Sequence, residues 1–305
     1  MVVAVTNIAN GFIAGSFEFL FIIAYKAYQD KILSRFYIYD IMFQGGRITM
    51  AKFDGFLICS DLDGTFNGGE NTIETNSKAV RYFTDNGGKF SFITGRTASY
   101  LAEQEFFGLM NAPAGVFNGA MTYDYHNKKI LTESRLDFTL GDFADVVDCG
   151  KFKFETVGVY NDFFAPWQRM NVFSDYKDIF TEKMLKIVCV FKTLDEADEF
   201  KSFALKHKFF KNTYISKSWP YGVEFNAADG TKGNVIRFIK QYLGNIHTSV
   251  GIGDFENDVK LLQYADIGVA TGNAVDEVKA VADIITKDFR ECAIADLIEI
   301  LESRI

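Results

Sequence analysis

Proline, histidine and cysteine are all scarce in this sequence, and each scarcity excludes a class of structure. Three prolines in 305 residues exclude Pro-rich linkers, so any domain boundary must be found from the pattern of strands and helices. The three histidines stand alone, without an HExxH or similar metal-ligand motif around them. The four cysteines, Cys59, Cys149, Cys189 and Cys292, form no CxxC pair, which argues against a zinc ribbon. In a chain of this length they are interpreted as reduced thiols rather than as a disulfide framework.

An excess of basic charge is also missing. The chain has 40 acidic and 32 basic residues, a formal net charge of −8, whereas proteins that bind duplex nucleic acid usually carry basic patches. We therefore expect no nucleic-acid partner. No GxxxxGK[ST] loop is present, which argues against a nucleotide kinase. Apolar residues make up 48% and charged residues 24%, as in soluble globular proteins, and the length suggests two domains or one domain with an insertion.

The first fifty residues do not match the rest of the chain. Residues 11–25 are mostly apolar, but this stretch is shorter than the roughly 20 residues of a membrane span and contains Glu18, which is costly at mid-bilayer. No Lys or Arg precedes it, as the basic region of a signal peptide would require. Three interpretations stay open: an added amphipathic or buried helix, a weak membrane anchor, or a stretch that is not part of the native protein.

The third interpretation places the native start at Met50, just before the first predicted strand. Gln44-Gly45-Gly46 could be encoded by a sequence that resembles a bacterial ribosome-binding site at a suitable distance upstream. It predicts that a chain beginning at Met50 is fully folded and active. We expect a cytoplasmic location and no membrane partner, with an anchor through residues 11–25 as the alternative.

From residue 51 onward, short apolar runs alternate with amphipathic segments. The runs at 56–60, 90–93 and 115–117 are typical of strands buried on both faces of a parallel sheet, and helices are predicted between them. The same alternation returns after residue 227. Helices are predicted over 76–86, 98–107, 232–243, 258–264, 275–281 and the last residues to 303, and the later strands over 249–253, 267–270 and 284–285.

Between these stretches the pattern changes to α+β. It comprises a hairpin of 121–125 and 129–132, helices over 138–147 and 195–208, and strands over 186–191, 214–217 and 222–226. The predicted fold class is α/β, with a doubly wound, mostly parallel, Rossmann-like core sheet and an inserted α+β domain. The core is assigned to 51–120 and 227–305, the insertion to 121–226, and an N-terminal extension to 1–50.

Four short polar motifs fall at or beside the ends of these strands, where open α/β sheets bind ligands. The first is Asp61-Leu62-Asp63-Gly64-Thr65. In an extended segment, residues i and i+2 share a face, so both carboxylates can reach one site. Paired carboxylates can serve as a nucleophile and a general acid/base, or as two metal ligands. The alternative is a polar turn that ends the strand.

The second and third motifs suit an anionic ligand. In Thr94-Gly95-Arg96, a hydroxyl and a backbone N–H beside a glycine can hold a phosphate oxygen, although Thr94 could equally be an ordinary helix cap. Thr231-Lys232-Gly233 brings a cation to the predicted start of a helix, where anions bind, although Lys232 alone would more often be a solvated surface charge.

The fourth motif, Gly253-Asp254-Phe255-Glu256-Asn257-Asp258, follows an apolar strand. Two acids four residues apart, with Asn257 between them, suit a hard cation with oxygen ligands. The alternative is an Asx-type cap of the next helix. Each motif alone is a modest signal, but the four together, in this order and around an inserted domain, are specific.

This constellation resembles the haloacid dehalogenase superfamily, and within it the Cof-type, sugar-phosphatase-like subfamily, which has a large α/β cap between the second and third core motifs. The resemblance covers about 53–305 and includes 268–274, which looks like that subfamily's stretch after the last acidic motif. Thr271 stands where many members carry Met. Residues 1–50 have no counterpart.

The resemblance implies Mg²⁺-dependent phosphoryl transfer. Carried over by motif, Asp61 is the nucleophile that forms an aspartyl-phosphate, and Asp63 protonates the leaving oxygen and then deprotonates the hydrolytic water. The phosphoryl group is held by Thr94, Gly95, Lys232 and Asn257. The metal is bound by Asp61, the backbone carbonyl of Asp63, and Asp254, with Asp258 close by or acting through water.

The expected function is therefore hydrolysis of small phosphorylated metabolites, with sugar phosphates as the default and nucleotide-like or cofactor phosphates equally compatible. A phosphosugar mutase or phosphotransferase would use the same nucleophile. A receiver-like signalling domain would also use an acceptor Asp, but the insertion and the second acid, Asp63, oppose it. A catalytically idle binding module is opposed by the completeness of the four motifs.

Overall fold

The computed structural model describes residues 51–147, 151–161, 168–170 and 182–305, with the backbone alone for 168–170. The interpretations of residues 1–50, the possible anchor at 11–25 among them, and Cys149 lie outside these ranges. The fold described below is that of the compact unit Ala51–Glu299. Across the described ranges, no helix is both long and apolar enough to cross a membrane.

A five-stranded parallel sheet forms the centre of this unit, in the order β13-β12-β11-β1-β2. Its strands are β1 (Phe56–Ser60), β2 (Lys89–Phe92), β11 (Thr248–Gly253), β12 (Ile267–Ala270) and β13 (Ile284–Ile285). The chain runs outward from β1 to β2 on one side and returns through β11 to β13 on the other. The strand order therefore reverses between β1 and β11, which is where open α/β sheets form a ligand crevice. The predicted doubly wound α/β fold class is confirmed.

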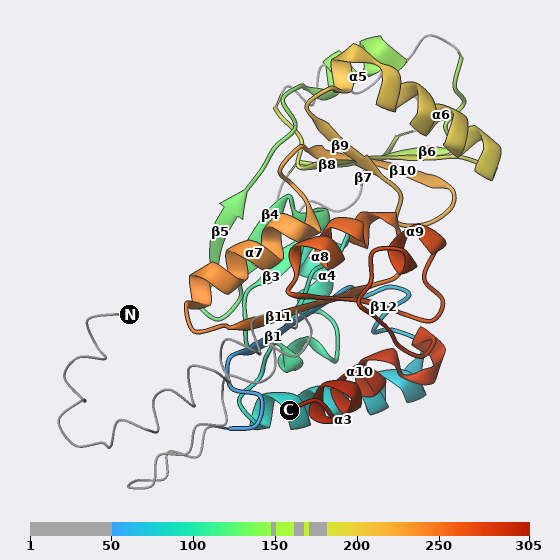
Figure 1. Cartoon of the computed structure of the whole chain (residues 1–305). Helices are drawn as coiled ribbons and strands as arrows, with labels where there is room; N and C mark the ends of the chain where they lie inside the picture. Colours follow the sequence, from blue (N-terminus) through green and yellow to red (C-terminus); the bar gives the residue numbers. More distant parts are fainter. Residues whose placement is uncertain (1–50, 148–150, 162–167, 171–181) are drawn as a thin grey trace, which may run out of the picture. The chain divides into compact units, whose positions relative to one another are not determined.

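Helices cover both faces of the parallel sheet (Figure 1). On one face lie α3 (Glu70–Asp85) and α10 (Ala293–Glu302), and on the other α7 (Lys232–Leu243) and α8 (Val259–Tyr264). Leu57 and Cys59 of β1 pack with apolar residues of α7 and α8 in one buried cluster. Two short helices, α4 (Ala98–Ala102) and α9 (Asp276–Lys279), complete this part.

Two helices differ from the sequence prediction. Helix α3 begins at Glu70 rather than at 76. Its first turns are polar, so they lack the apolar spacing that predicted the rest of the helix. The buried amide of Asn76 holds this part of the helix in place, since it donates to Phe66 O and accepts from Ala295 N. Helix α4 ends at Ala102 rather than at 107. The chain leaves the helix there, and the Phe106 ring packs 5.2 Å from Phe66, between ring centroids.

A three-stranded antiparallel sheet adjoins the parallel sheet. It contains β3 (Ala114–Val116), β4 (Met121–Asp124) and β5 (Lys129–Glu133), and β3 is linked to the end of β2 by a single parallel bridge between Ile93 and Gly115. The predicted hairpin therefore pairs with β3. We propose, on strand pairing, that the inserted domain begins after this hairpin, whereas the sequence pattern placed its start at 121.

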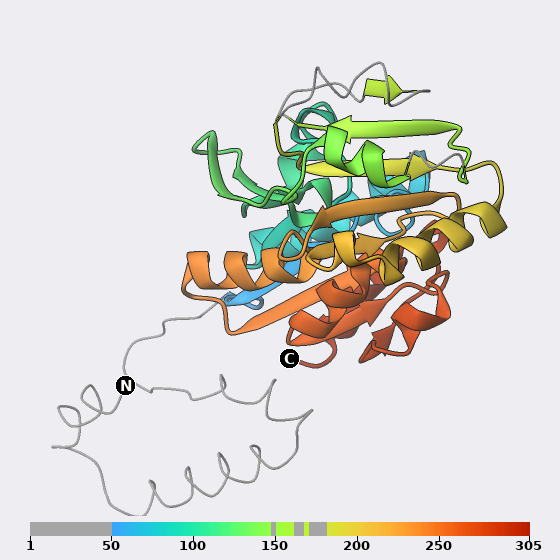
Figure 2. The ribbon, with the colours of Figure 1, turned by 90° about the horizontal axis from the view of Figure 1, so that it is seen from above.

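A second five-stranded sheet is antiparallel throughout, in the order β7-β6-β8-β10-β9. Its strands are β6 (Thr156–Tyr160), β7 (Gln168–Met170), β8 (Lys186–Val190), β9 (Thr213–Ser216) and β10 (Gly222–Ala227). The sequence analysis did not predict β6 and β7. Helices α5 (Leu140–Val147) and α6 (Leu194–Lys206) lie on one face of this sheet, and Figure 2 shows α6 (yellow) on the side of β9 and β10.

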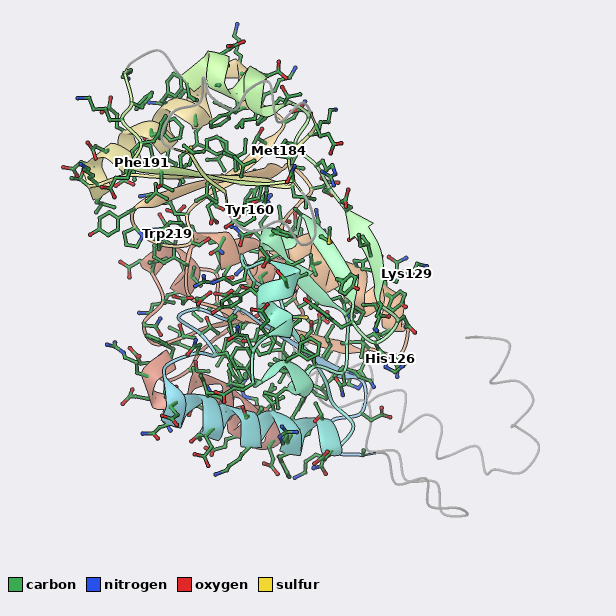
Figure 3. The ribbon with its side chains drawn as sticks, turned by 180° about the vertical axis from the view of Figure 1, so that it is seen from behind. His126, Lys129, Tyr160, Met184, Phe191 and Trp219 are labelled. Carbon is green, nitrogen blue, oxygen red and sulfur yellow. The ribbon has the colours of Figure 1, made fainter. Side chains whose placement is uncertain are left out.

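The two faces of the antiparallel sheet carry different sets of side chains. The face under α5 and α6 is filled with aromatic rings, among them Phe143, Phe200 and Phe225, which accounts for part of the chain's high Phe content. Figure 3 shows Tyr160 and Trp219 on the other side of the sheet.

Short 3₁₀ segments occur at Phe107–Leu109, Phe117–Gly119, Lys208–Phe210, Glu256–Asp258 and Phe289–Glu291.

Candidate active site

Two acidic residues leave neighbouring strands at the point where the sheet order reverses. Asp61 follows β1 directly and its backbone N–H donates to Ile252 O of β11 at 2.9 Å, while Asp254 follows β11. One carboxylate oxygen from each of Asp61, Asp254 and Asp258 lies within 4.8 Å of the others. The fold thus brings together residues that are almost two hundred positions apart in the sequence. Such a group of oxygen ligands suits a hard divalent cation.

Lys232 lies inside this group of carboxylates. Thr231 caps α7 by accepting from Asn234 N, which makes Lys232 the first residue of the helix. Its ammonium group donates to Asp61 Oδ1 at 2.6 Å and to Asp258 Oδ1 at 2.7 Å, and the side chain is fully buried. The alternative interpretation of Lys232 as a solvated surface charge is therefore wrong. Three carboxylates and one ammonium carry a formal net charge of −2, which one divalent cation balances.

The electrostatics of the cluster reflect this excess of negative charge. Burial raises the pKa of Asp61 well above its usual value and Asp258 raises it further, against the opposing effect of Lys232. Burial, together with Asp258, raises the pKa of Asp254 to about 7. Burial lowers the pKa of Lys232, but the carboxylates of Asp258 and Asp61 more than offset this and raise it overall. Without a bound cation, the cluster therefore resists full ionisation.

The loop after β1 closes tightly over Asp254. Thr65 Oγ1 donates to Asp254 Oδ1 at 3.1 Å, and Asn273 Nδ2 donates to Gly64 O at 3.0 Å and to Asp254 Oδ2 at 3.4 Å. Gly64 has φ +79°, and a Cβ there would lie 2.4 Å from Asp254 Oδ2. Only glycine fits both the backbone conformation and the space. Sequence reasoning assigned no role to Asn273, although its place in the 268–274 stretch was a usable signal.

Asp258 has both carboxylate oxygens engaged. Oδ1 accepts from Lys232, and Oδ2 accepts from the backbone N–H groups of Asp254 at 3.0 Å and Phe255 at 3.1 Å. These bonds fix the loop after β11 and hold the lysine in place. Asp258 therefore supports both the loop after β11 and the position of Lys232.

The side chain of Asp63 is not part of this group of carboxylates. Leu62 O accepts from both Phe66 N and Asn67 N, so the chain turns directly after β1 instead of remaining extended. The i, i+2 rule for strands consequently does not carry over to Asp61 and Asp63. The Asp63 side chain is 47% exposed and its oxygens accept from Arg96 Nε at 2.8 Å and Arg96 Nη2 at 3.0 Å. Sequence reasoning gave Arg96 no role, although it is the third residue of the second motif.

The second motif and Asn257 lie together around one residue that the prediction missed, Asn118. Thr94 is fully buried; its O accepts from Asn118 N at 2.9 Å, and its Oγ1 accepts from Arg96 N at 3.1 Å. Asn257 Nδ2 donates to Asn118 Oδ1 at 3.1 Å, and a Cβ on Gly95 would lie 2.8 Å from the same oxygen. Asn257 Oδ1 is buried, and no donor within the described ranges reaches it, so this oxygen is available to accept a hydrogen bond.

A cavity of about 580 Å³ lies elsewhere in the unit. Its lining includes Phe107, Tyr125 and Tyr242 and none of the candidate residues named above. Cavity size therefore does not locate the site.

Known proteins resemble this chain over most of its length. A family model described as haloacid dehalogenase-like hydrolase matches residues 58–298, which is most of the chain. A 5-amino-6-(5-phospho-D-ribitylamino)uracil phosphatase of Bacillus subtilis is 28% identical over 245 residues, which cover 79% of this chain and 94% of that protein. A crystal structure of a haloacid dehalogenase-like hydrolase from Bacteroides thetaiotaomicron is 21% identical, with a TM-score of 0.63, over 82% of this chain and 99% of that one.

Other relatives match only in part. A phosphoglycolate phosphatase of Sulfurisphaera tokodaii is 36% identical over 70 residues, which cover 21% of this chain and 31% of that protein. Three such matches span only 31–36% of the length of the relatives concerned.

Proposed function

The chain belongs to the haloacid dehalogenase-like hydrolases, and from this premise we propose that it is a Mg²⁺-dependent phosphatase acting on small phosphorylated metabolites, sugar phosphates first among them. The observation that carries the proposal is the buried Lys232, held 2.6 Å from Asp61 and 2.7 Å from Asp258 beside Asp254. Stability alone does not account for a buried ammonium beside buried acids, because all these charges must leave water, and a role toward a ligand does. We further propose a cytoplasmic location and no nucleic-acid partner.

The residues present fit a magnesium ion. Asp61 and Asp254 would hold it with their carboxylates, together with the backbone carbonyl of Asp63, while Asp258 fixes the loop. The formal charge of −2 and the raised pKa of Asp254 support a divalent cation at this place. When bound, Mg²⁺ would supply the positive charge that lets a carboxylate approach a phosphate dianion.

In the proposed reaction, a carboxylate oxygen of Asp61 attacks phosphorus as the bond from phosphorus to the ester oxygen breaks, which gives an aspartyl-phosphate. Lys232 stays beside the attacking carboxylate, and Thr94, Gly95 and Asn257 hold the phosphoryl oxygens. Because transfer of a phosphoryl group depends mainly on positioning and charge neutralisation, these contacts account for most of the catalysis.

Asp63 would give a proton to the leaving oxygen and then take one from the water that cleaves the aspartyl-phosphate. Its carboxylate faces Arg96 in the structure described above. The reaction therefore requires Asp63 to exchange Arg96 for the leaving oxygen once substrate is bound. The exposure of the ion pair, close to half for both side chains, makes this exchange inexpensive.

Phosphate release from a panel of phosphorylated metabolites, with Mg²⁺ and with EDTA, tests the proposal on the full chain. Asp61→Asn should abolish the Mg²⁺-dependent release. Asp195→Asn is the control, because Asp195 is an exposed acid in the first turn of α6 and should leave release unchanged. Retained turnover in Asp61→Asn would disprove the assignment of the nucleophile, and no release from any ester by the wild type would disprove the function.

A further inference from the structure

The antiparallel sheet buries a charged pair on the face opposite its aromatic core. In β10, Val223 and Phe225 belong to the aromatic core, so Glu224 points the other way. In β8, Ile187 and Cys189 belong to that core, so Lys186 lies on the same side as Glu224. Lys186 Nζ and Glu224 Oε1 are 2.7 Å apart, and the two side chains are only 3% and 2% exposed.

This pair contacts the second motif directly and reaches Asn257 of the fourth motif through Asn118. Lys186 Nζ donates to Gly95 O at 3.2 Å, next to Thr94. Glu224 Oε2 accepts from Asn118 Nδ2, and Asn118 Oδ1 in turn accepts from Asn257. An unbroken chain of polar contacts therefore runs from Gly95 through the buried pair and Asn118 to Asn257.

Gly95, Asn118 and Lys186 are closely packed against one another. A Cβ on Gly95 would lie 2.8 Å from Asn118 Oδ1 and 3.3 Å from Lys186 Nζ. Asn118 itself has φ +61°, a conformation that few side chains adopt, and is fully buried. Ser218 adds a further hydrogen bond to Glu224 and also accepts from Asn257 Nδ2 at 3.2 Å. A shift of the charged pair would therefore displace the second motif and Asn257 together.

Stability alone does not explain a buried ion pair on a sheet face. Apolar residues of similar volume at such positions are often as stabilising or more so, because both charges must leave water. The pair has no net charge and so adds nothing to the attraction of a phosphate dianion. What it offers is a fixed geometry between two strands of the antiparallel sheet and the residues proposed to hold the phosphoryl group.

We propose that Lys186 and Glu224 are positioning residues, which set Gly95 and Asn257 in the geometry that binds the phosphoryl group. This inference rests on the proposed function, because it gives the pair its effect through the proposed phosphate-binding residues. The pair touches no reacting atom. Its loss lowers the affinity for phosphate while leaving the nucleophile and its lysine in place.

The test compares wild type with the double variant Lys186→Met/Glu224→Gln, which removes both charges and leaves no lone buried ion. With p-nitrophenyl phosphate and Mg²⁺, KM should rise at least tenfold, and the inhibition constant of inorganic phosphate should rise in parallel. A merely structural role would lower the fraction of folded enzyme and hence the apparent kcat, but it would not change these two constants. The control is Lys151→Met/Glu199→Gln, an ion pair of 3.2 Å whose side chains are more than half exposed, which should change both constants less than twofold.

Asn118→Ala serves if the double variant does not fold, because it cuts the link to Asn257 without removing a charge, and it should raise the same two constants at least fivefold. Constants within twofold of wild type in whichever of the two variants folds would overturn the inference. A wild type that neither hydrolyses p-nitrophenyl phosphate nor binds inorganic phosphate would overturn the proposed function and this inference together. Wild-type activity that is lost in Asp61→Asn but kept with unchanged constants in the double variant would overturn this inference alone.

Discussion

Replacing Lys232 by methionine removes the only ammonium group that contacts Asp61 and Asp258 in the described part of the chain, while it keeps a side chain of similar length. The lysine is fully buried and makes two contacts shorter than 2.8 Å, so nothing in the solvent can replace it. Breaking a buried ion pair typically costs 3–5 kcal/mol, because the partner charge stays buried and uncompensated. In EDTA, we expect the free energy of unfolding of Lys232→Met to fall by about 3–5 kcal/mol.

The matched control is Lys240→Met, the same substitution on the same helix. Lys240 pairs with Asp266 where each side chain is about one third exposed. Partly exposed ion pairs of this kind usually contribute about 0–1 kcal/mol, so the control should lose far less stability. Urea denaturation of both variants and of wild type, each in EDTA, measures the difference. An equal loss in the two variants would refute the electrostatic account of the cluster.

The pH dependence of Lys232→Met gives a second measure of the same effect. Lys232 opposes the rise in the pKa of Asp61, so without it this pKa moves further up. A folded-state pKa above the unfolded value means that the folded state binds more protons, and stability then falls as pH rises. The loss should therefore be larger at pH 8 than at pH 5.5, where protonation relieves the repulsion. A loss that is the same at both values, or larger at pH 5.5, would contradict this reasoning.

Three further predictions concern the same site. In Gly64→Ala, Mg²⁺ should no longer raise the midpoint temperature of thermal unfolding, because the alanine Cβ would lie 2.4 Å from Asp254 Oδ2 and φ is +79°. A rise equal to that of wild type would contradict the position given to Asp254. Calorimetric Mg²⁺ affinity should fall as pH drops from 8 to 6, since protons compete for Asp254, whose pKa is raised to about 7, and a pH-independent affinity would argue against this ligand. Arg96→Gln should change the free energy of unfolding by no more than about 1 kcal/mol. It should nevertheless alter the ratio of turnover between an alkyl phosphate and p-nitrophenyl phosphate, because only the poorer leaving group needs the proton of Asp63; an unchanged ratio would count against the exchange of partners at Asp63.

The strand ends could be read from the sequence because of how a parallel sheet is buried. A strand covered on both faces carries charged residues only where it ends, so Asp61 and Asp254 stand out after buried runs of five and six uncharged residues. β6 could not be found in the same way. It has two core residues, Val157 and Val159, separated by a glycine, and it is defined by pairing with β8, where Val159 lies opposite Ile187. Because β6 and β8 are about 30 residues apart in the sequence, their pairing leaves no pattern within β6 itself that would predict a strand.

The same distinction separates the site residues that were predicted from those that were missed. Asp61, Lys232 and Asp254 lie in motifs whose spacing carries chemistry. The side chain of Asn118 instead bonds Glu224 and Asn257 from a backbone conformation with φ +61°, which no spacing indicates. Lys186 and Glu224 are 38 positions apart and meet only because β8 and β10 are neighbours. A charged residue in an otherwise mostly apolar predicted strand was the available signal for both. The shared face of Asp61 and Asp63 was inferred from the period of a strand that ends at Ser60, so the role proposed for Asp63 rests on its motif alone.

Charge and position are supplied by different parts of this fold. The unbalanced charge lies at the carboxyl ends of β1 and β11, where three acids surround Lys232. This arrangement favours a divalent cation, and without one it would repel a phosphate dianion. The antiparallel sheet contributes a neutral pair, Lys186 and Glu224, whose contacts reach Gly95 directly and Asn257 through Asn118. Substitutions at the first group should therefore change metal affinity and its pH dependence, whereas substitutions at the second should change phosphate affinity at constant metal affinity. The two sets of residues can be separated by that difference, because a common structural role would move both affinities together.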